Sequence, residues 1–116
     1  MTARTGSFGF PPPVYIEPSL NELFAKLRLE NHLKTLEPDQ FTNRAAHYLS
    51  ELNAIHPFRE GNGRTQREFI RQLALAAGHP LSWKNITKEE NDEASRISFA
   101  TGNSTGLTTI LRKCLL

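Results

Sequence analysis

The sequence HPFREGNGRTQR, residues 56–67, lies between two stretches whose apolar side chains recur at helical spacing. Pro57 disfavours helical geometry at the residue before it, so the preceding helix should end there. A following helix should start around Asn62 or Gly63. The stretch therefore predicts two helices joined by a short glycine-containing loop, with apolar faces in residues 41–55 and 69–77.

Three further segments carry helix signals. In two of them, a Ser or Thr followed three residues later by Glu forms a capping-box pattern. The predicted helices run from Ser19, paired with Glu22, to between Leu33 and Leu36; from Thr87, paired with Glu90, to about Ala100; and from Ser104 or Thr105 towards the last residues.

The first eighteen residues are predicted to be non-helical because they combine several prolines and glycines with apolar side chains. An extended arm and a hairpin-like loop both fit this composition, and we expect an ordered flap with apolar anchors. The fold class is therefore an all-α bundle with a short, non-helical or β-hairpin-like N-terminal flap. We expect one domain over residues 1–116, with the flap in residues 1–18 and the helical core in residues 19–116.

Composition narrows the functional classes. The net charge is only +2, and no lysine-rich block accompanies the isoelectric point of about 8.9, so nucleic-acid binding is not expected. No apolar run approaches the roughly 18 residues of a membrane span, and a membrane role is not expected either. Because Cys114 is the single cysteine, an internal disulfide is impossible, and the reducing cytoplasm is the simplest compartment.

Residues of the 56–67 stretch suit the binding of phosphate groups. Gly61 and Gly63 are expected to let the backbone take unusual dihedral angles, so that successive amides turn towards one anion at a helix N-terminus. Arg64 and Arg67 are three positions apart, hence on one helical face, and both can reach phosphates above that terminus. Two such cations imply more than one phosphate group.

Two more residues of the stretch supply reactive chemistry. Glu60 is an oxygen ligand of the kind that Mg²⁺ accepts together with phosphate oxygens and water. His56 has an ordinary pKa near neutrality and can take a proton from an attacking hydroxyl. Each of these features alone is more often structural, but their order and spacing together favour a site that binds a metal-bound nucleotide.

The same stretch resembles the Fic signature, H-x-F-x-D/E-G-N-G-R-x-x-R, at every specified position. Residues 10–16 also resemble the flap of that family, and residues 89–111 are similar to its closing helices. The resemblance implies a compact Fic-type helical bundle. It also implies a protein adenylyltransferase, an enzyme that moves AMP from ATP to a Ser, Thr or Tyr hydroxyl of a target protein and releases pyrophosphate.

The resemblance also implies a role for each matching residue. His56 would deprotonate the target hydroxyl, and Glu60 would hold Mg²⁺ between the α- and β-phosphates. The phosphates would be bound by an anion hole of Gly61, Asn62 and Gly63, by Arg64 at the β-phosphate and by Arg67 at the γ-phosphate. The flap, with Phe8, Gly9 and Phe10, would hold the target segment through backbone pairing.

Regulation and alternatives are also expectations from the resemblance. Family members usually carry further helices upstream, which this chain is expected to lack. The inhibitory S/T-x-x-x-E-G/N pattern is absent, so control would come from an antitoxin-like protein or from a missing N-terminal segment. The protein would act in the cytoplasm or be exported into another cell as an effector. The alternatives are a nucleotide-binding module without transferase activity and a Fic variant that transfers another phosphate-containing group.

Overall fold

The computed structural model describes residues 16–55 and 62–116, and within them the chain forms five α-helices and two short 3₁₀ turns. A single antiparallel bridge joins Leu81 to Leu115, and there is no β-strand in the described residues. The all-α prediction is thereby confirmed. In chain order the elements are α1 (Ile16–Leu29), η2 (Asn31–Leu33), α2 (Pro38–Ile55), α3 (Asn62–Ala76), η3 (Trp83–Asn85), α4 (Lys88–Thr101) and α5 (Thr105–Cys114).

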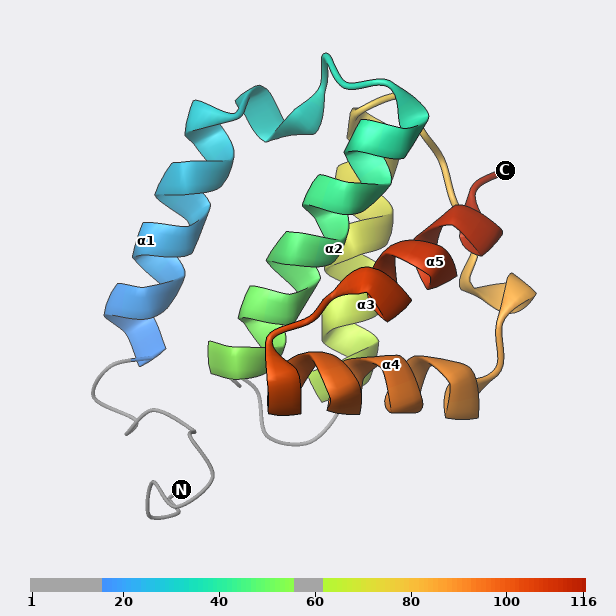
Figure 1. Ribbon diagram of the computed structural model, residues 1–116. Coiled ribbons are helices and arrows are strands. Elements are labelled where there is room, and N and C mark those ends of the chain that lie inside the picture. The colour runs from blue at the N-terminus through green and yellow to red at the C-terminus, as the bar shows by residue number, and fades with distance from the viewer. Residues whose placement is uncertain (1–15, 56–61) are drawn as a thin grey trace.

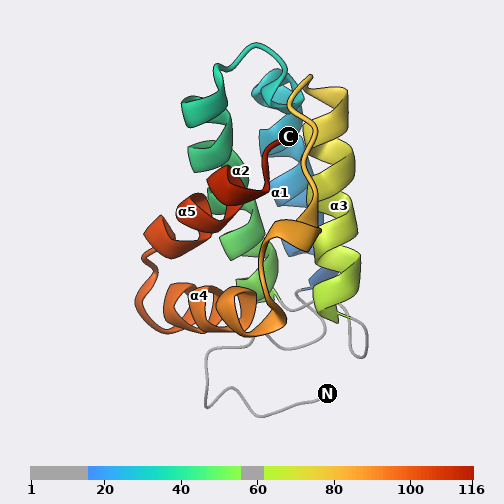
Figure 2. The same ribbon diagram turned by 90° about the vertical axis from the view of Figure 1, so that its right-hand side faces the viewer.

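Helix α2 is the centre of the bundle (Figure 1). It packs against each of α1, α3, α4 and α5. Helix α4 lies across one end of the bundle, and this is the end at which α2 finishes and α3 begins (Figures 1 and 2). The packing therefore places the end of α2 at Ile55 and the start of α3 at Asn62 at the end of the bundle that α4 crosses.

The core forms around the inward face of α2, as the helical spacing of its apolar residues predicted. Phe41 is fully buried and Tyr48 is nearly so. Apolar side chains from the other helices complete one continuous cluster. Its buried members outside α2 are Leu23, Leu27, Leu33, Ile70, Leu73, Ala74, Ala77, Leu81, Ala94, Leu107, Ile110, Leu111 and Cys114.

Local signals fixed the ends of α3 and α4. Gly78 has φ +86°, and the amides of Gly78 and His79 donate to the carbonyls of Leu75 and Ala74, which is a Schellman motif. At α4, the Thr87 hydroxyl accepts from the Glu90 amide (3.0 Å). The Glu90 carboxylate in turn accepts from the Thr87 amide (2.8 Å), so the predicted capping box is confirmed.

The prediction for the first helix was wrong at both ends. Helix α1 begins at Ile16, so residues 16–18 are helical and Ser19 lies inside the helix rather than capping it. Pro18 is compatible with this start because the first turn of a helix needs no amide hydrogen there. The helix ends at Leu29, before the predicted range, because the three residues of η2 have positive φ angles of 56°, 53° and 63°.

A polar cluster anchors the end of α1 to α2. The Arg44 guanidinium donates to both carboxylate oxygens of Glu30 (2.9 and 2.6 Å), and the Tyr48 hydroxyl donates to one of them (2.5 Å). Hydrogen bonds from Arg44 lower the pKa of Glu30 to about 2, although burial opposes the shift. Burial and the neighbouring Glu30 carboxylate raise the pKa of Tyr48 to about 12. These contacts and the complete burial of Leu33 stabilise the left-handed turn.

We predict that Glu30→Gln lowers the free energy of unfolding at pH 7 by about 1 kcal/mol, a value reduced for the partial exposure of the pair. The folded-state pKa of Glu30 lies below its ordinary 4.5, so its stabilisation is complete above that pH and is lost as the pH falls towards 2. Urea denaturation at pH 7 and pH 3 measures this. The difference between wild type and variant should shrink at pH 3, and an equal difference at both pH values would contradict the account. Glu93→Gln, which removes an exposed pair with Arg96, is the control.

Candidate functional site

The candidate site lies where α2 ends at Ile55 and α3 begins at Asn62. Residues 56–61 connect these two helix ends, and α4 crosses the same end of the bundle (Figure 2). The structure thus positions Ile55 and Asn62, the residues on either side of the 56–61 segment that the sequence indicated as functional. Six of the predicted site residues fall outside the described part of the chain: His56, Glu60, Gly61, Phe8, Gly9 and Phe10.

The first turn of α3 is suited to binding an anion. Asn62, Gly63 and Arg64 form this turn, and the first amide groups of a helix have no partner within it. The helix dipole adds partial positive charge at the same end. The predicted helix start around Asn62 or Gly63 is confirmed, and its first-turn amides lie at the end of the bundle where α2 also ends.

The reason given for Gly63 was wrong. Its backbone is helical rather than left-handed, because it lies inside the first turn of α3. What the glycine supplies is space: a Cβ atom at this position would lie 3.0 Å from Nη1 of Arg67. The Arg67 guanidinium therefore lies close to the Gly63 backbone, and a side chain there would push it away.

Arg64 and Arg67 lie in the first two turns of α3, as predicted. Arg64 is exposed and Arg67 is partly buried, and neither guanidinium forms an ion pair within residues 16–55 and 62–116. The other charged pair of the helix is neutralised, since Arg71 donates to both carboxylate oxygens of Glu68 (2.9 and 2.7 Å). The uncompensated positive charge of α3 is thus concentrated at its N-terminal end.

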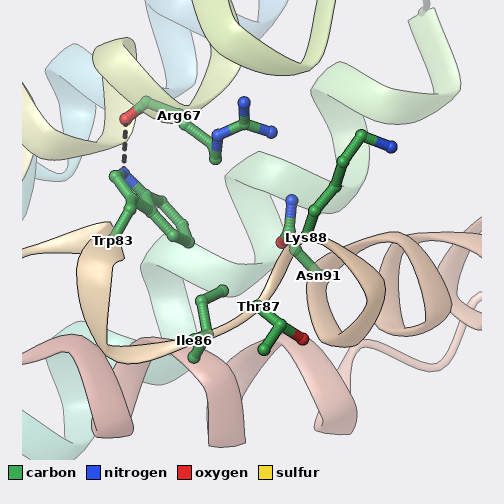
Figure 3. A pocket seen from close by; sticks show the side chains of 6 residues that line it. All are labelled: Arg67, Trp83, Ile86, Thr87, Lys88 and Asn91. Atoms are coloured by element: carbon green, nitrogen blue, oxygen red, sulfur yellow. Dashed lines mark hydrogen bonds between the residues drawn. The ribbon is translucent and has the colours of Figure 1, made fainter.

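A pocket of about 190 Å³ adjoins Arg67 (Figure 3). The indole Nε1–H of Trp83 donates to the Arg67 carbonyl oxygen (2.9 Å), which ties η3 to α3. Among the described residues, none that lines the pocket carries a carboxylate. The lining residues are Arg67, Trp83, Ile86, Thr87, Lys88 and Asn91.

Two residues of α4 give this pocket its polar character. Lys88 brings a second positive charge, and its ammonium is hydrogen-bonded to Asp92 (2.6 Å), which raises the pKa of the lysine. Asn91 is only 7% exposed, and its Oδ1 has no hydrogen-bond partner among the described residues. The pocket therefore combines Arg67, a lysine paired with Asp92 and a buried acceptor without a partner among the described residues, beside the first turns of α3.

The sequence did not indicate that Lys88 and Asn91 belong with Arg67. Trp83 packs against the core, and the sequence did not indicate its hydrogen bond to Arg67. Lys88 and Asn91 reach the pocket because the connector after α3 returns α4 to the bundle end. The tryptophan in that connector was the one signal that could have suggested the contact.

The described residues contain no cluster of three or more His, Cys, Asp or Glu side chains that could hold a metal ion. In residues 16–55 and 62–116, every helix is too short or too polar to cross a membrane.

The sequence profile of the Fic/DOC family matches residues 2–74, more than half of the chain. The chain belongs to the Fic/DOC family. Protein adenylyltransferase VbhT of Bartonella schoenbuchensis is 44% identical over 100 residues, covering 86% of this chain and 21% of the relative. A probable protein adenylyltransferase Fic of Escherichia coli is 46% identical over 99 residues, covering 85% of this chain and 49% of the relative.

Solved Fic structures share the fold. The type IV secretion system effector protein BepA superimposes with a TM-score of 0.88 at 36% identity, covering 99% of this chain and 39% of that one. The crystal structure of BepC from Bartonella tribocorum with bound AMPPNP gives a TM-score of 0.86 at 33% identity, covering 92% and 51%. The chain thus spans between about a fifth and a half of the length of the relatives described.

We predict that Gly63→Ala leaves the fold intact but displaces the Arg67 guanidinium. The added Cβ would meet, at 3.0 Å, only the flexible end of the Arg67 side chain, which can move, and alanine favours a helix over glycine by up to about 1 kcal/mol. NMR of the arginine Nε–Hε groups should show a shifted Arg67 signal, and chemical denaturation should show no loss of stability.

The matched control is Gly106→Ala. Gly106 is likewise the second residue of its helix, but a Cβ there would meet only Ala94, with the side chain nearest at 3.4 Å. This variant should leave the Arg67 signal in place. If Gly63→Ala did not move that signal either, the space at Gly63 would not be what accommodates Arg67.

Proposed function

We propose that this Fic/DOC protein is a protein adenylyltransferase that transfers AMP from ATP to a Ser, Thr or Tyr hydroxyl of a target protein. The observation that carries the proposal is the pair of arginines without ionic partners in the described residues, Arg64 and Arg67, beside the first-turn amides of α3. Support also comes from relatives named adenylyltransferases at 44% and 46% identity, and from a structural neighbour with bound AMPPNP.

In the proposed reaction, His56 takes the proton of the target hydroxyl while its oxygen attacks the α-phosphorus of ATP. A new bond forms between that oxygen and the α-phosphorus. The bond from the α-phosphorus to the oxygen that bridges the α- and β-phosphates breaks, and pyrophosphate leaves with the electron pair. His56 is suited to this role because α2 ends at Ile55, directly before it, beside the start of α3.

The first turns of α3 would bind the phosphates. Amides of Gly61, Asn62 and Gly63 would form the anion hole, with Arg64 at the β-phosphate and Arg67 at the γ-phosphate. Fixed donors placed where charge develops on the leaving group lower the barrier without reorganising during the reaction. The absence of an ionic partner for either arginine among the described residues leaves both free to compensate pyrophosphate.

A magnesium ion fits this arrangement through Glu60. One or two carboxylates together with substrate phosphates and water are the usual ligands of Mg²⁺, and the described residues contribute no competing cluster of metal ligands. When bound, Mg²⁺ neutralises charge on the triphosphate and helps to orient it. Glu60 would hold the ion between the α- and β-phosphates.

The flap would recognise the target protein. Phe8, Gly9 and Phe10 would pair with an extended target segment through backbone hydrogen bonds, which give affinity with limited side-chain selectivity. We further propose that an antitoxin-like protein inhibits the enzyme. The enzyme would act in the cytoplasm of its own cell or of another cell. Neighbours such as BepC are described as translocated effector proteins, which supports export.

A second candidate function is nucleotide binding without transfer. The observation that favours it is that the described residues supply phosphate-binding groups, namely Arg64, Arg67 and the first-turn amides of α3, which can serve binding alone. A protein of this kind would bind Mg²⁺–ATP without modifying any substrate.

We predict that the purified protein, incubated with lysate, Mg²⁺ and ATP labelled at the α-phosphate, labels protein bands that disappear with His56→Ala. The loss should be about a hundredfold or more, because general-base catalysis typically contributes that much. ATP labelled at the γ-phosphate should label no band. Autoradiography after gel electrophoresis measures both.

The control is His32→Asn, which changes an exposed histidine in η2 to a residue that tolerates its φ of 53°. It should label as wild type does. Labelling from the γ-phosphate would replace adenylylation by phosphorylation, and equal labelling by His56→Ala would remove His56 from the mechanism. Binding of ATP with no labelled band would favour the second candidate.

A further inference from the structure

Arg67 is held by packing rather than by charge. Its guanidinium has no ionic partner among the described residues, although an arginine side chain has many accessible rotamers. Among the described residues, the direction in which it points is bounded by the walls around it. Those walls are the bare backbone of Gly63 on one side and the pocket residues of η3 and α4 on the other.

Trp83 is the wall that is joined directly to Arg67. Its indole Nε1–H donates to the Arg67 carbonyl oxygen at 2.9 Å, across 16 positions of sequence, and its ring packs on the core cluster (Figure 3). A carbonyl inside an α-helix is already paired with the amide four residues later, so this bond is additional. It fixes the backbone from which the Arg67 side chain departs and places an aromatic surface beside that side chain.

The remaining walls of the pocket are contributed by α4. Lys88 lines the pocket, and its ammonium is paired with Asp92 (2.6 Å). Asn91 offers an open, buried acceptor inside the pocket, within the same set of walls. Because Gly63 has no side chain, the guanidinium can lie over the first turn of α3, where the anion-binding amides are.

We propose that Trp83 is a positioning residue that holds Arg67 over the first turn of α3 and thereby determines the preference of the site for nucleoside triphosphates over diphosphates. The inference rests on the proposed function, in which Arg67 contacts the γ-phosphate. ADP has no γ-phosphate, so its binding should not depend on where Arg67 points. A tryptophan that only stabilised the fold would affect both nucleotides alike.

The test is isothermal titration calorimetry of Mg²⁺–ATP and Mg²⁺–ADP with the full chain and its variants. Trp83→Phe keeps an aromatic ring and removes the N–H donor. We expect it to weaken ATP binding roughly three- to tenfold, the usual net effect of one hydrogen bond, and to leave ADP binding unchanged. Arg67→Ala should abolish the preference for ATP and also leave ADP binding unchanged.

The matched control is Asn85→Ala. Asn85 lies in the same η3 turn and also donates from its side chain to a backbone carbonyl, that of Lys113 at 3.1 Å, but it does not line the pocket. This variant should bind both nucleotides as wild type does.

A second variant removes the N–H donor and keeps the shape of the side chain. Trp83 is the single tryptophan of the chain, so 3-benzothienylalanine can be incorporated at this position alone, and it replaces the indole N–H by sulfur in a ring system of nearly the same shape.

The outcomes distinguish the positioning role of Trp83 from the proposed adenylyltransferase function on which it rests. A loss of ATP preference in Arg67→Ala, in Trp83→Phe and in the benzothienylalanine protein supports the positioning role. The inference on Trp83 is overturned, and the role of Arg67 stands, if Arg67→Ala loses the preference for ATP while the benzothienylalanine protein keeps it. The same holds if the benzothienylalanine protein loses affinity equally for ATP and ADP. If Arg67→Ala keeps the preference, the proposed γ-phosphate contact is overturned, and the positioning role with it.

Discussion

Burial of α2 at the centre of the bundle is the constraint on which the rest of the structure depends. This helix packs against each of the other four, and its largest inward side chains, Phe41 and Tyr48, are almost completely excluded from solvent. Truncating a buried aromatic of this kind typically costs about 3–5 kcal/mol, a large share of the stability of a small domain. Because α2 cannot shift, its end at Ile55 and the start of α3 at Asn62 remain at one end of the bundle.

The distribution of charge along α3 then decides what this end of the bundle can bind. Arg71 and Glu68 compensate each other, whereas Arg64 and Arg67, closer to the N-terminus, have no ionic partner among the described residues. Their charge adds to that of the helix dipole and to the amides of the first turn, which have no partner within the helix. Lys88 lines the adjoining pocket, with its ammonium paired to Asp92. This arrangement supports the proposed triphosphate substrate, and the chain belongs to the Fic/DOC family.

Where short-range signals determined the structure, the sequence predicted it: the start of α3 around Asn62 or Gly63 and the Thr87 capping box of α4. It failed at the end of α1, because the left-handed turn there depends on Leu33 burial and on contacts from residues 14 and 18 positions away. The same division holds at the site. The spacing of Arg64 and Arg67 was enough to place them together, but the pocket beside Arg67 required the connector to fold back, which no local pattern specifies. For Gly63 the sequence predicted unusual backbone dihedral angles, but its backbone is helical. Its role is to leave space for the side chain of Arg67, one helical turn away.

The central claim is that the first turns of α3 bind the phosphates of ATP, with Arg67 at the γ-phosphate. A crystal structure of the full chain with Mg²⁺ and a non-hydrolysable ATP analogue tests it most directly. The account predicts β- and γ-phosphate oxygens within hydrogen-bond distance of the α3 first-turn amides and the two guanidinium groups, with Arg67 lying over Gly63 and still bonded to Trp83. A nucleotide whose phosphates lie away from α3, or whose γ-phosphate is bound without Arg67, would contradict it.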